Sequence, residues 1–459
     1  MERFDVFVIG GGGTGSEIAF KLAERSDLRV AIAERDKLGG ECNHYGCVPT
    51  KVMLRSAKLA AQARDAARLG LRIPSVEVDL PAIKQRARDV IDAQSGEGEK
   101  PFLEVGVRVF MQEARLVGER AIELADGTQV EAERVVLATG TEATAPPVPG
   151  LAEGPYWTNR EAIWEPEAVP TSLAVIGTGA IGIEFAQIYA RFGTRVTAIE
   201  VLPQIMPKED GEVAEALAPA LEQDGIRLLA GTTIERAAHG PSGWTLRLEG
   251  GETIAADQVL VAAGRRPVFG VHDLDAAGVA VDDRGRPVLS PTLRTTAPNL
   301  WAAGDATGEL LFTHVGTYEA ELVVDDILGH PRAREYRVVP RVTFCDPEVA
   351  SVGLTEREAR KAGHDVRTAL SLMRDNERAA IDGRAFGIVK LVADAHTGEL
   401  LGGHIVGEDA GAMIHEVVAA MTGRVPAAAL GEAVHAYPTL SESVKDAFAR
   451  LAQPARAVS

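Results

Sequence analysis

The sequence predicts an α/β protein that contains two consecutive copies of the same strand–turn–helix–strand unit. A glycine-rich turn occurs twice, and each turn follows an apolar strand and precedes a helix and a second strand that ends in glutamate. The chain of 459 residues is also too long for a single hydrophobic core. The sequence therefore indicates several domains, two of which share one architecture.

The first copy begins with an expected strand over residues 4–9 and continues with an expected helix over 16–25 and a strand over 30–33. A closing strand is expected over 135–138. Glycines let the backbone approach a pyrophosphate, the helix N-terminus faces its charge, and the acid can accept from a ribose hydroxyl. The residues predicted to bind a dinucleotide here are Gly10, Gly12, Gly15, Glu34, Thr139 and Gly140.

The second copy repeats this series downstream. Its strands are expected over residues 173–176 and 195–199, with a helix that ends near 192 and a closing strand over 259–263. The same physical reasons predict a second dinucleotide site, with Gly177, Gly179, Gly182, Glu200 and Gly264 as its residues.

Two cysteines, Cys42 and Cys47, lie close together in a chain with only three. A regular helix would separate positions i and i+5 by roughly 7.5 Å along its axis, and a disulfide needs Cα atoms within about 7 Å. The segment must therefore leave regular helix for the pair to close. Pro49 suits the first turn of a helix just beyond, and that helix N-terminus together with Lys51 would stabilise a thiolate. The pattern predicts a redox-active pair.

Two other interpretations of these cysteines stay open. They could be two free thiols, or half of a zinc site with His44, although zinc needs four ligands and the sequence has no second cysteine pair. We predict no metal site. The third cysteine, Cys345, lies in an apolar strand pattern and is expected to pack as a small hydrophobic residue.

The composition narrows the range of partners. A net charge of −18 argues against nucleic acid or an anionic membrane as a partner. No apolar run is long enough to span a bilayer, and no secretion signal is visible at the N-terminus. We expect a cytoplasmic protein, and in that compartment a disulfide is usually transient and catalytic.

Two dinucleotides and a dithiol together indicate an electron relay. Nicotinamide passes hydride, whereas thiols react by stepwise exchange, and a flavin can couple the two chemistries. One of the two dinucleotides is therefore expected to be a flavin.

The motifs resemble those of the FAD-dependent pyridine nucleotide–disulfide oxidoreductases of class I, which include dihydrolipoyl dehydrogenase, glutathione reductase and mercuric reductase. Residues 39–51 follow the pattern G-G-x-C-x-x-x-x-C-x-P-x-K, and residues 301–305 resemble the second flavin motif. Residues 343–355 resemble the start of the dimerisation domain, and residues 435–442 its C-terminal active-site motif. The likeness covers nearly the whole chain.

This resemblance implies a domain order and a set of partners. An FAD-binding domain (1–148) is interrupted by an NAD(P)-binding domain (149–270), the chain returns to the flavin domain (271–337), and a C-terminal α+β dimerisation domain follows (338–459). The cofactors would be FAD and NAD, with Gly40 and Asp305 among the flavin contacts. The protein would be a homodimer with shared active sites that acts on a small-molecule or protein-bound disulfide, such as a lipoyl group.

The resemblance also implies roles for the active-site residues. Cys47 would lie nearest the flavin, and Cys42 would attack the substrate. Lys51 and Glu184 would form an ion pair near the reactive nitrogen of the flavin. The C-terminal motif, with Tyr437 and Glu442, would face the other subunit's dithiol.

Tyr437 departs from the family pattern, because dihydrolipoyl dehydrogenase and glutathione reductase have a histidine there that serves the thiols as acid and base. The reference pKa of tyrosine lies about 3.5 units above that of histidine, so tyrosine is a much poorer base near neutral pH. His435 could substitute, since both side chains would point the same way in an extended segment. Glu442 either orients one of these residues or serves packing and dimer contacts.

Glu200 indicates NADH in preference to NADPH. A carboxylate at the end of that strand can accept from a free 2′-hydroxyl and would repel a 2′-phosphate. The next residues, 201–204, supply no arginine, although Lys208 leaves use of both nucleotides open.

The leading functional hypothesis is an NADH-dependent flavoprotein disulfide reductase, similar to dihydrolipoyl dehydrogenase in most motifs and active in cell redox homeostasis. A metal or quinone reductase similar to mercuric reductase is the first alternative, although the sequence shows neither a C-terminal cysteine pair nor an N-terminal metal-binding domain. A redox-sensing flavoprotein with weak catalysis is an alternative of another class.

Overall fold

The computed structural model describes residues 2–270 and 272–453. The chain divides into two compact units. Unit 1 comprises Met1–Val52, Lys84–Thr144 and Gly264–Glu335, and unit 2 comprises Met53–Ile83, Ala145–Ala263 and Tyr336–Ser459. The finer domain boundaries expected from the sequence stay predictions.

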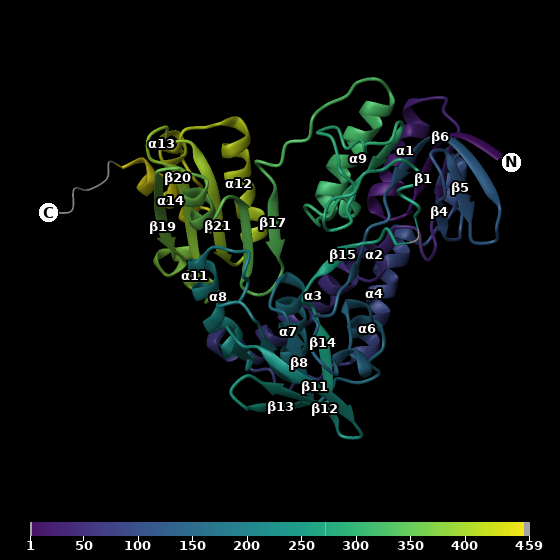
Figure 1. The fold of residues 1–459 in the computed structure, drawn as a ribbon. Helices are drawn as coiled ribbons and strands as arrows, with labels where there is room; N and C mark the ends of the chain where they lie inside the picture. Colours follow the sequence, from purple (N-terminus) through teal and green to yellow (C-terminus); the bar gives the residue numbers. More distant parts are fainter. Residues whose placement is uncertain (1, 271, 454–459) are drawn as a thin grey trace. The chain divides into compact units, whose positions relative to one another are not determined.

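Unit 1 is built on a seven-stranded sheet in the order β3-β2-β1-β6-β5-β4, with β16 also paired to β6 (Figure 1). The pairs among β1, β2, β3, β6 and β16 are parallel, and β4 and β5 are antiparallel additions. The strands are β1 (Glu2–Ile9), β2 (Val30–Ala33), β3 (Arg108–Phe110), β4 (Ala114–Leu116), β5 (Ala121–Leu124), β6 (Gln129–Leu137) and β16 (Leu300–Ala302).

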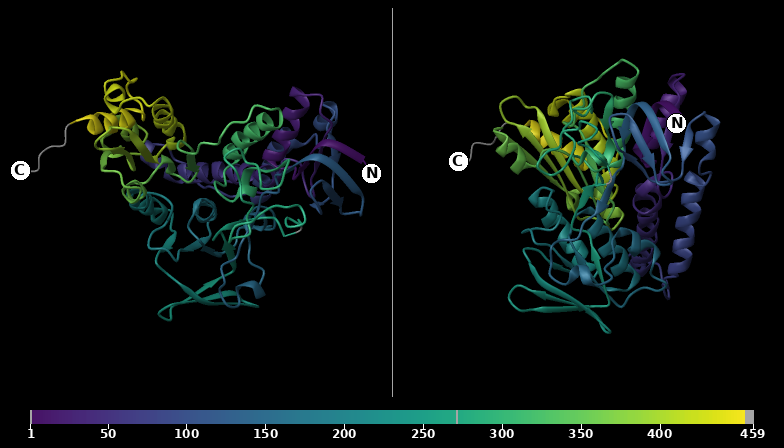
Figure 2. Two further views of the ribbon diagram at one scale, coloured as in Figure 1. Left: turned by 45° about the horizontal axis from the view of Figure 1, so that its top comes forward. Right: turned by 45° about the vertical axis from the view of Figure 1, so that its right-hand side comes forward.

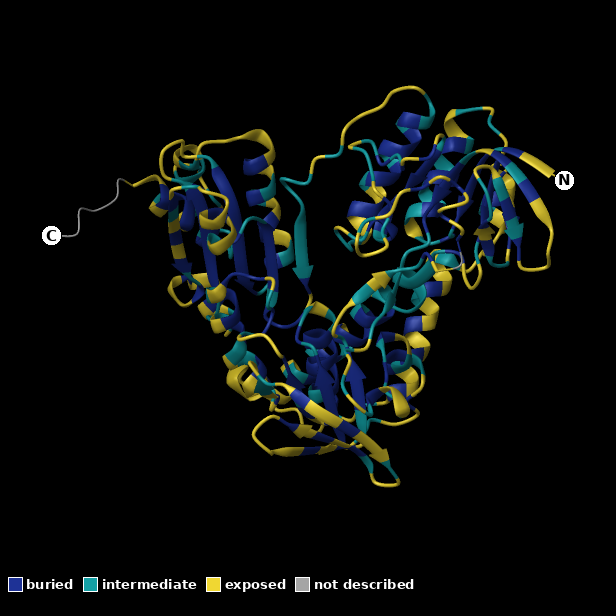
Figure 3. Ribbon diagram, in the orientation of Figure 1, coloured by how far each residue is buried: buried dark blue, intermediate teal, exposed yellow. Residues whose placement is uncertain are grey.

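Strand β1 shows why this sheet is buried on both faces. Val6 and Val8 pack into one hydrophobic cluster, whereas Phe7 and Ile9 pack into another, as side chains alternate along a strand. Figure 3 shows these central strands as buried. The other elements of unit 1 are α1 (Gly13–Arg25), α2 (Gly40–His44), α5 (Lys100–Glu104), β7 (Thr141–Ala143), β15 (Arg265–Pro267), η3 (Gly304–Thr307) and α9 (Thr313–Ile327). Helices α1 and α9 both contribute to the cluster that contains Val6.

A buried histidine in unit 1 leads to a pH prediction. His272 is 9% exposed, and its Nδ1 accepts from the Leu116 N–H at 3.1 Å. Burial lowers the pKa of His272 to about 4. Because the folded pKa lies below the unfolded value, folding stability is retained above about pH 6.5 and is lost as the pH falls toward 4.

We expect that lowering the pH from 7 to 5 removes about 2 kcal/mol of unfolding free energy through His272. Asparagine cannot titrate, so the unfolding free energy of the His272→Asn variant should fall by about 2 kcal/mol less than that of the wild type between pH 7 and pH 5. Urea unfolding at the two pH values measures this difference, and parallel pH profiles for the two proteins would contradict the prediction.

Unit 2 contains a four-stranded parallel sheet in the order β10-β9-β8-β14 and a three-stranded antiparallel sheet, β11-β12-β13. The strands are β8 (Ser172–Ile176), β9 (Arg195–Ile199), β10 (Arg227–Leu229), β11 (Ile234–Gly240), β12 (Gly243–Leu248), β13 (Thr253–Ala256) and β14 (Gln258–Val261). The shorter helices and the helices beside these sheets are η1 (Ala66–Leu69), η2 (Leu151–Glu153), α6 (Asn159–Trp164), α7 (Ala180–Phe192) and α8 (Gly211–Gln223). Helices α3 (Cys47–Asp65) and α4 (Leu80–Ser95) have residues in both units.

The C-terminal part of unit 2 is a five-stranded antiparallel sheet in the order β17-β18-β21-β20-β19. Helices α12 and α14 share one hydrophobic cluster with it, and Figure 2 shows the yellow C-terminal helices against its strands. The elements are β17 (Pro340–Thr343), β18 (Glu348–Gly353), α10 (Glu356–Lys361), β19 (Val366–Leu372), η4 (Met373–Asp375), α11 (Glu377–Ile381), β20 (Ile388–Asp394), β21 (Leu400–Gly407), α12 (Ala410–Gly423), α13 (Ala427–Gly431) and α14 (Glu442–Ala452).

The predicted fold class is confirmed: two parallel βαβ sheets of Rossmann type precede a C-terminal α+β domain. Cys345 is buried as expected, although it lies in the turn between β17 and β18 and not in a strand. Within residues 2–270 and 272–453, no helix combines the length and the apolar character needed to cross a membrane.

Candidate active site and dinucleotide sites

The first glycine turn closely approaches the backbone of its neighbours. Gly10 has φ +106°, and a Cβ there would lie 2.3 Å from the Ala138 carbonyl oxygen. A Cβ on Gly15 would lie 1.9 Å from the Gly10 carbonyl oxygen. Only glycine fits at these two positions. A Cβ on Gly12 would meet nothing nearer than 4.0 Å, so this position leaves space for a ligand.

The groups around this turn fit a flavin dinucleotide. The carboxylate of Glu34 accepts from the Gly11 N–H at 2.8 Å, which orients it at the end of β2. The hydroxyl oxygen of Thr139 is buried and has no hydrogen-bond partner among the described residues. Burial raises the pKa of Asp305, whose carboxylate accepts from the Thr141 hydroxyl at 3.1 Å. Such a buried, unpaired hydroxyl beside an open glycine turn is consistent with a binding site for FAD.

The redox segment packs directly onto the first glycine turn. The Gly39 N–H donates to the Gly11 carbonyl at 2.8 Å. Gly40 has φ +61°, and a Cβ there would lie 2.7 Å from the Gly12 Cα. The predicted site residue Gly40 therefore lets the dithiol segment lie against the turn.

The two cysteines lie on different helices, as the spacing argument requires. Cys42 belongs to α2, which ends at His44, and Cys47 is the first residue of α3. Helix α3 therefore begins two residues before Pro49 and not beyond it. Both cysteines are free thiols in this structure. The ring of His44 donates from Nε2 to the Leu38 carbonyl at 2.8 Å.

The dithiol has a hydroxyl partner that the sequence reasoning missed. Thr313 Oγ1 donates to Cys42 Sγ at 3.2 Å and lies 3.7 Å from Cys47 Sγ. The hydrogen bond with Cys47 and burial raise the pKa of Cys42, while the Thr313 hydroxyl and the Lys51 charge oppose that rise. The hydrogen bond and burial thus favour the protonated form of Cys42. Thr313 opens helix α9 shortly after the motif that ends in Asp305, which was the available sequence signal.

The second glycine turn has the same construction as the first. Gly177 has φ +97°, and a Cβ there would lie 2.6 Å from the Ala262 carbonyl oxygen. A Cβ on Gly182 would lie 1.9 Å from the Gly177 carbonyl oxygen, whereas Gly179 faces open space. This open space above a helix N-terminus fits the pyrophosphate of a nicotinamide dinucleotide. Gly264, which was predicted as part of this second site, lies in unit 1 and has φ +154°.

Glu200 is held firmly at the end of β9. It is 7% exposed, and its carboxylate accepts from the Thr178 N–H and hydroxyl at 3.0 and 3.1 Å. It also accepts from the Leu202 N–H at 3.0 Å. The structure thus brings Glu200 to the second glycine turn, as the sequence predicts.

Helix α7 is fixed along one side by polar side chains. Glu184 accepts from the Phe344 N–H at 2.8 Å, and Gln187 accepts from the Asp346 N–H at 2.7 Å. Arg191 binds the Asp346 carboxylate at 2.8 Å. Because these positions share one helix face, they hold α7 against the turn after β17. The predicted ion pair between Lys51 and Glu184 stays a prediction.

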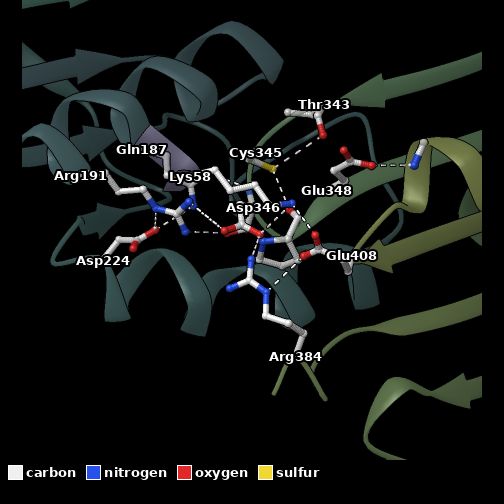
Figure 4. A network of polar contacts seen from close by, with 12 residues as sticks. Lys58, Gln187, Arg191, Asp224, Thr343, Cys345, Asp346, Glu348, Arg384 and Glu408 are labelled. Atoms are coloured by element: carbon white, nitrogen blue, oxygen red, sulfur yellow. Dashed lines mark hydrogen bonds and ion pairs between the residues drawn. The ribbon is translucent and has the colours of Figure 1, made fainter. Parts of the chain in front are cut away.

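Figure 4 shows the buried charges around Asp346. Arg384 also binds this carboxylate, and Lys58 lies 3.8 Å from it. Both cations share Glu408, at 3.1 and 2.6 Å. Asp346 is only 4% exposed, so each of these charges needs its partners.

The C-terminal motif places its three predicted residues in separate contacts. The His435 ring has Nε2 3.0 Å from Glu416 Oε1 and Nδ1 3.3 Å from the Ala433 carbonyl. Glu442 accepts from the Thr439 N–H at 3.0 Å. Both ring nitrogens of His435 thus face acceptors on its own chain, and Glu416 rather than Glu442 orients the ring.

Tyr437 is the most exposed of the three predicted residues of the motif. Its side chain is 70% exposed, and a hydrogen bond with Glu377 raises the pKa of its hydroxyl. Tyr437 is therefore a poor base, and its accessible hydroxyl can donate to a ligand or be held by Glu377.

Comparison with known proteins gives matches along almost the whole chain. Residues 4–320 match the family described as pyridine nucleotide-disulphide oxidoreductase, and residues 339–448 match its dimerisation domain.

A dihydrolipoyl dehydrogenase of Chlorobaculum tepidum is 38% identical over 457 residues, which cover 97% of this chain and 96% of that protein. A mercuric reductase of Bacillus cereus is 35% identical over 447 residues, 96% of this chain and 70% of that protein.

Two solved structures have the same fold. A Cu(II) complex of the HOCl-induced flavoprotein disulfide reductase RclA from Escherichia coli superimposes with a TM-score of 0.87 at 28% identity, over 98% of this chain and 99% of that chain. LpdA from Mycobacterium tuberculosis superimposes with a TM-score of 0.87 at 26% identity, over 98% of this chain and 100% of that chain.

Proposed function

Because this chain belongs to the pyridine nucleotide–disulphide oxidoreductases, homodimeric FAD-dependent enzymes that pass electrons between NAD(P)H and a disulfide, we propose that it is an NADH-dependent reductase whose acceptor needs no imidazole acid. The observation that carries this proposal is Tyr437 in the exposed position of the C-terminal motif. The nearby imidazole of His435 is engaged by Glu416 and a backbone carbonyl.

When bound, FAD would couple hydride transfer from NADH to the reduction of a disulfide. Gly10, Gly15, Glu34 and Asp305 would hold it. The reduced dithiol then acts in two exchange steps. The Cys42 thiol passes its proton to the Cys47 thiolate, and the Cys42 sulfur then attacks one sulfur of the acceptor disulfide, forms a mixed disulfide and expels the first thiolate. Cys47 releases that proton to solvent and becomes a thiolate again. The Cys47 thiolate attacks Cys42 Sγ, closes the Cys42–Cys47 disulfide and expels the second. Overall, NADH and one proton reduce one disulfide to two thiols.

Because the imidazole of His435 is engaged by Glu416 and a backbone carbonyl, we expect a limit on the disulfides that react well. A leaving thiolate departs faster when its thiol pKa is low, and it then needs no proton from the enzyme. Alkyl dithiols such as dihydrolipoamide have ordinary thiol pKa values and depend most on an acid and base. We therefore propose activated disulfides as acceptors, with lipoamide as a poor one.

A soft metal ion is the second candidate acceptor. Thiolates bind soft cations directly, and such a reaction needs no acid to protonate a leaving sulfur. A mercuric reductase among the relatives and a Cu(II) complex among the similar structures support this candidate.

The replacement Tyr437→His tests the proposed acceptor class. Steady-state NADH oxidation is measured for wild type and variant with lipoamide, glutathione disulfide, an activated aromatic disulfide, Hg(II) and a quinone. We expect lipoamide turnover near background in the wild type and a rise of about tenfold or more in the variant, as general acid–base catalysis returns.

The activated disulfide serves as the control, because its rate should change little between the two proteins. Fast lipoamide turnover by the wild type would contradict the proposal. Slow turnover with every acceptor would favour the redox-sensing alternative.

We propose NADH as the preferred nucleotide. Glu200 provides a buried carboxylate at the ribose position, and the following Val201 and Leu202 are 63% and 49% exposed. These two apolar side chains provide neither a positive charge nor a hydrogen-bond donor for a 2′-phosphate. The replacement Val201→Arg should raise kcat/KM for NADPH about tenfold through a charge-assisted contact and change that for NADH little. A wild-type preference for NADPH would contradict the assignment.

We also propose that the two active sites are shared, with the partner subunit's Tyr437 facing Cys42, and that the protein works in the cytoplasm. A monomeric form with full acceptor turnover would contradict the first statement. Recovery of the protein outside the cytoplasm in cell fractions would contradict the second.

A further inference from the structure

The loop after Glu200 contacts the second glycine turn directly. The Met206 N–H donates to the Thr178 carbonyl at 3.0 Å, and the Glu209 N–H donates to the Met206 carbonyl at 2.8 Å. Met206 is 4% exposed and has φ +49°, in the left-handed region that residues other than glycine rarely adopt. Such a conformation persists only where its surroundings hold it in place.

The side chain of Glu209, three residues after Met206, is anchored by an ion pair and a hydroxyl group. Its Oε1 accepts from Arg341 Nε at 2.7 Å, and its Oε2 accepts from Arg341 Nη2 at 3.2 Å. The Ser351 hydroxyl donates to Oε2 at 2.6 Å. Glu209 is 6% exposed, so this two-point ion pair is well shielded from water.

Within unit 2, the anchor belongs to the C-terminal sheet and not to the parallel sheet that carries the second glycine turn. Arg341 and Ser351 are directly opposite each other on β17 and β18, and Ser351 is opposite His404 on β21. Lys390 on β20 continues this row and binds Asp210 at 2.8 Å. Four neighbouring strands thus present one polar row to the end of the loop.

We propose that Glu209 and Arg341 are positioning residues for the nicotinamide nucleotide. The C-terminal sheet holds Glu209, Glu209 fixes Met206 in its left-handed conformation, and Met206 fixes Thr178 in the glycine turn. This inference rests on the proposed use of NADH at that turn. It means that the dimerisation domain contributes to nucleotide affinity through contacts within its own chain, separately from its contacts with a second subunit.

Calorimetric titration with NADH and with ADP-ribose tests the inference without any acceptor. We expect Glu209→Gln and Arg341→Met to raise both dissociation constants by about fivefold or more, and the double variant to be little worse than either single variant because they share one interaction. Arg341→Lys keeps the charge but loses the two-point geometry, so its dissociation constants should lie between those of wild type and Arg341→Met. In turnover, KM for NADH should rise while kcat at saturation changes less than twofold.

Lys58→Met is the matched control. Lys58 belongs to the buried network around Asp346 and pairs with Glu408 at 2.6 Å, and its ion pairs with other described residues do not involve the loop of residues 201–210. Its loss should lower the melting temperature but leave nucleotide affinity unchanged. Equal affinity in wild type, Glu209→Gln and Arg341→Met would overturn the inference, even if those variants melt earlier. A wild type that binds neither NADH nor NADPH would overturn the proposed function and this inference with it.

Discussion

The replacement Cys42→Ser is expected to reduce acceptor turnover by about a thousandfold or more, because it removes the sulfur that we propose attacks the acceptor. Reduction of the flavin by NADH should continue, since that step precedes the thiol chemistry. The remaining Cys47 thiolate should give a long-wavelength absorption band with the oxidised flavin. Stopped-flow spectra and steady-state rates measure these effects separately.

The replacement Cys47→Ser should lose acceptor turnover as Cys42→Ser does. The absorption spectra of the two variants should differ. Both variants lose the disulfide, but only Cys42→Ser retains the sulfur assigned to the flavin side. Cys345→Ser is the matched control, because this cysteine is buried in unit 2 and lies outside the redox segment of residues 39–51. A long-wavelength band in Cys47→Ser and not in Cys42→Ser would reverse the two assigned roles.

The second large effect is expected at Lys390, where Lys390→Met should lower the free energy of unfolding by about 3–5 kcal/mol. Lys390 is 2% exposed and lies 2.8 Å from Asp210, 2.8 Å from Glu356 and 2.7 Å from Glu212. Its removal leaves a buried carboxylate without a cation. Denaturant unfolding of wild type and variant at pH 7 measures the loss.

The contribution of this cluster should depend on pH in a defined direction. Burial alone would raise the pKa of Asp210, but hydrogen bonds from Glu212 and Lys390 hold it below its usual value. The stabilisation is therefore present above the unfolded pKa of about 3.9 and is lost as the pH falls below it. Lys361→Met, at an exposed lysine of α10, is the control and should change stability by less than about 0.5 kcal/mol.

The sequence predicted the parts of the sites that depend on local geometry. At four glycines a Cβ would meet a backbone carbonyl: Gly10, Gly15, Gly177 and Gly182. Because these positions require glycine, they form a motif that can be recognised in the sequence. The distortion between Cys42 and Cys47 followed from the spacing alone.

The sequence did not reveal contacts between distant segments. Thr313 reaches Cys42 from 271 residues away, and the pairing of Glu209 with Arg341 spans 132 residues. Neither has a local pattern, because the tertiary fold alone brings the partners together. The contact between His435 and Glu416 was missed for the same reason: the pattern suggested Glu442, which is nearer in sequence.

The near-identical construction of the two glycine turns has a consequence for cofactor choice. In each turn, a Cβ on the last glycine would lie 1.9 Å from the carbonyl oxygen of the first, so the two turns present almost the same cradle to a pyrophosphate. Two pyrophosphate-binding turns of the same shape cannot distinguish a flavin dinucleotide from a nicotinamide dinucleotide. Discrimination must arise at the far ends of each ligand, and engineering that aims to exchange cofactors should leave both cradles intact.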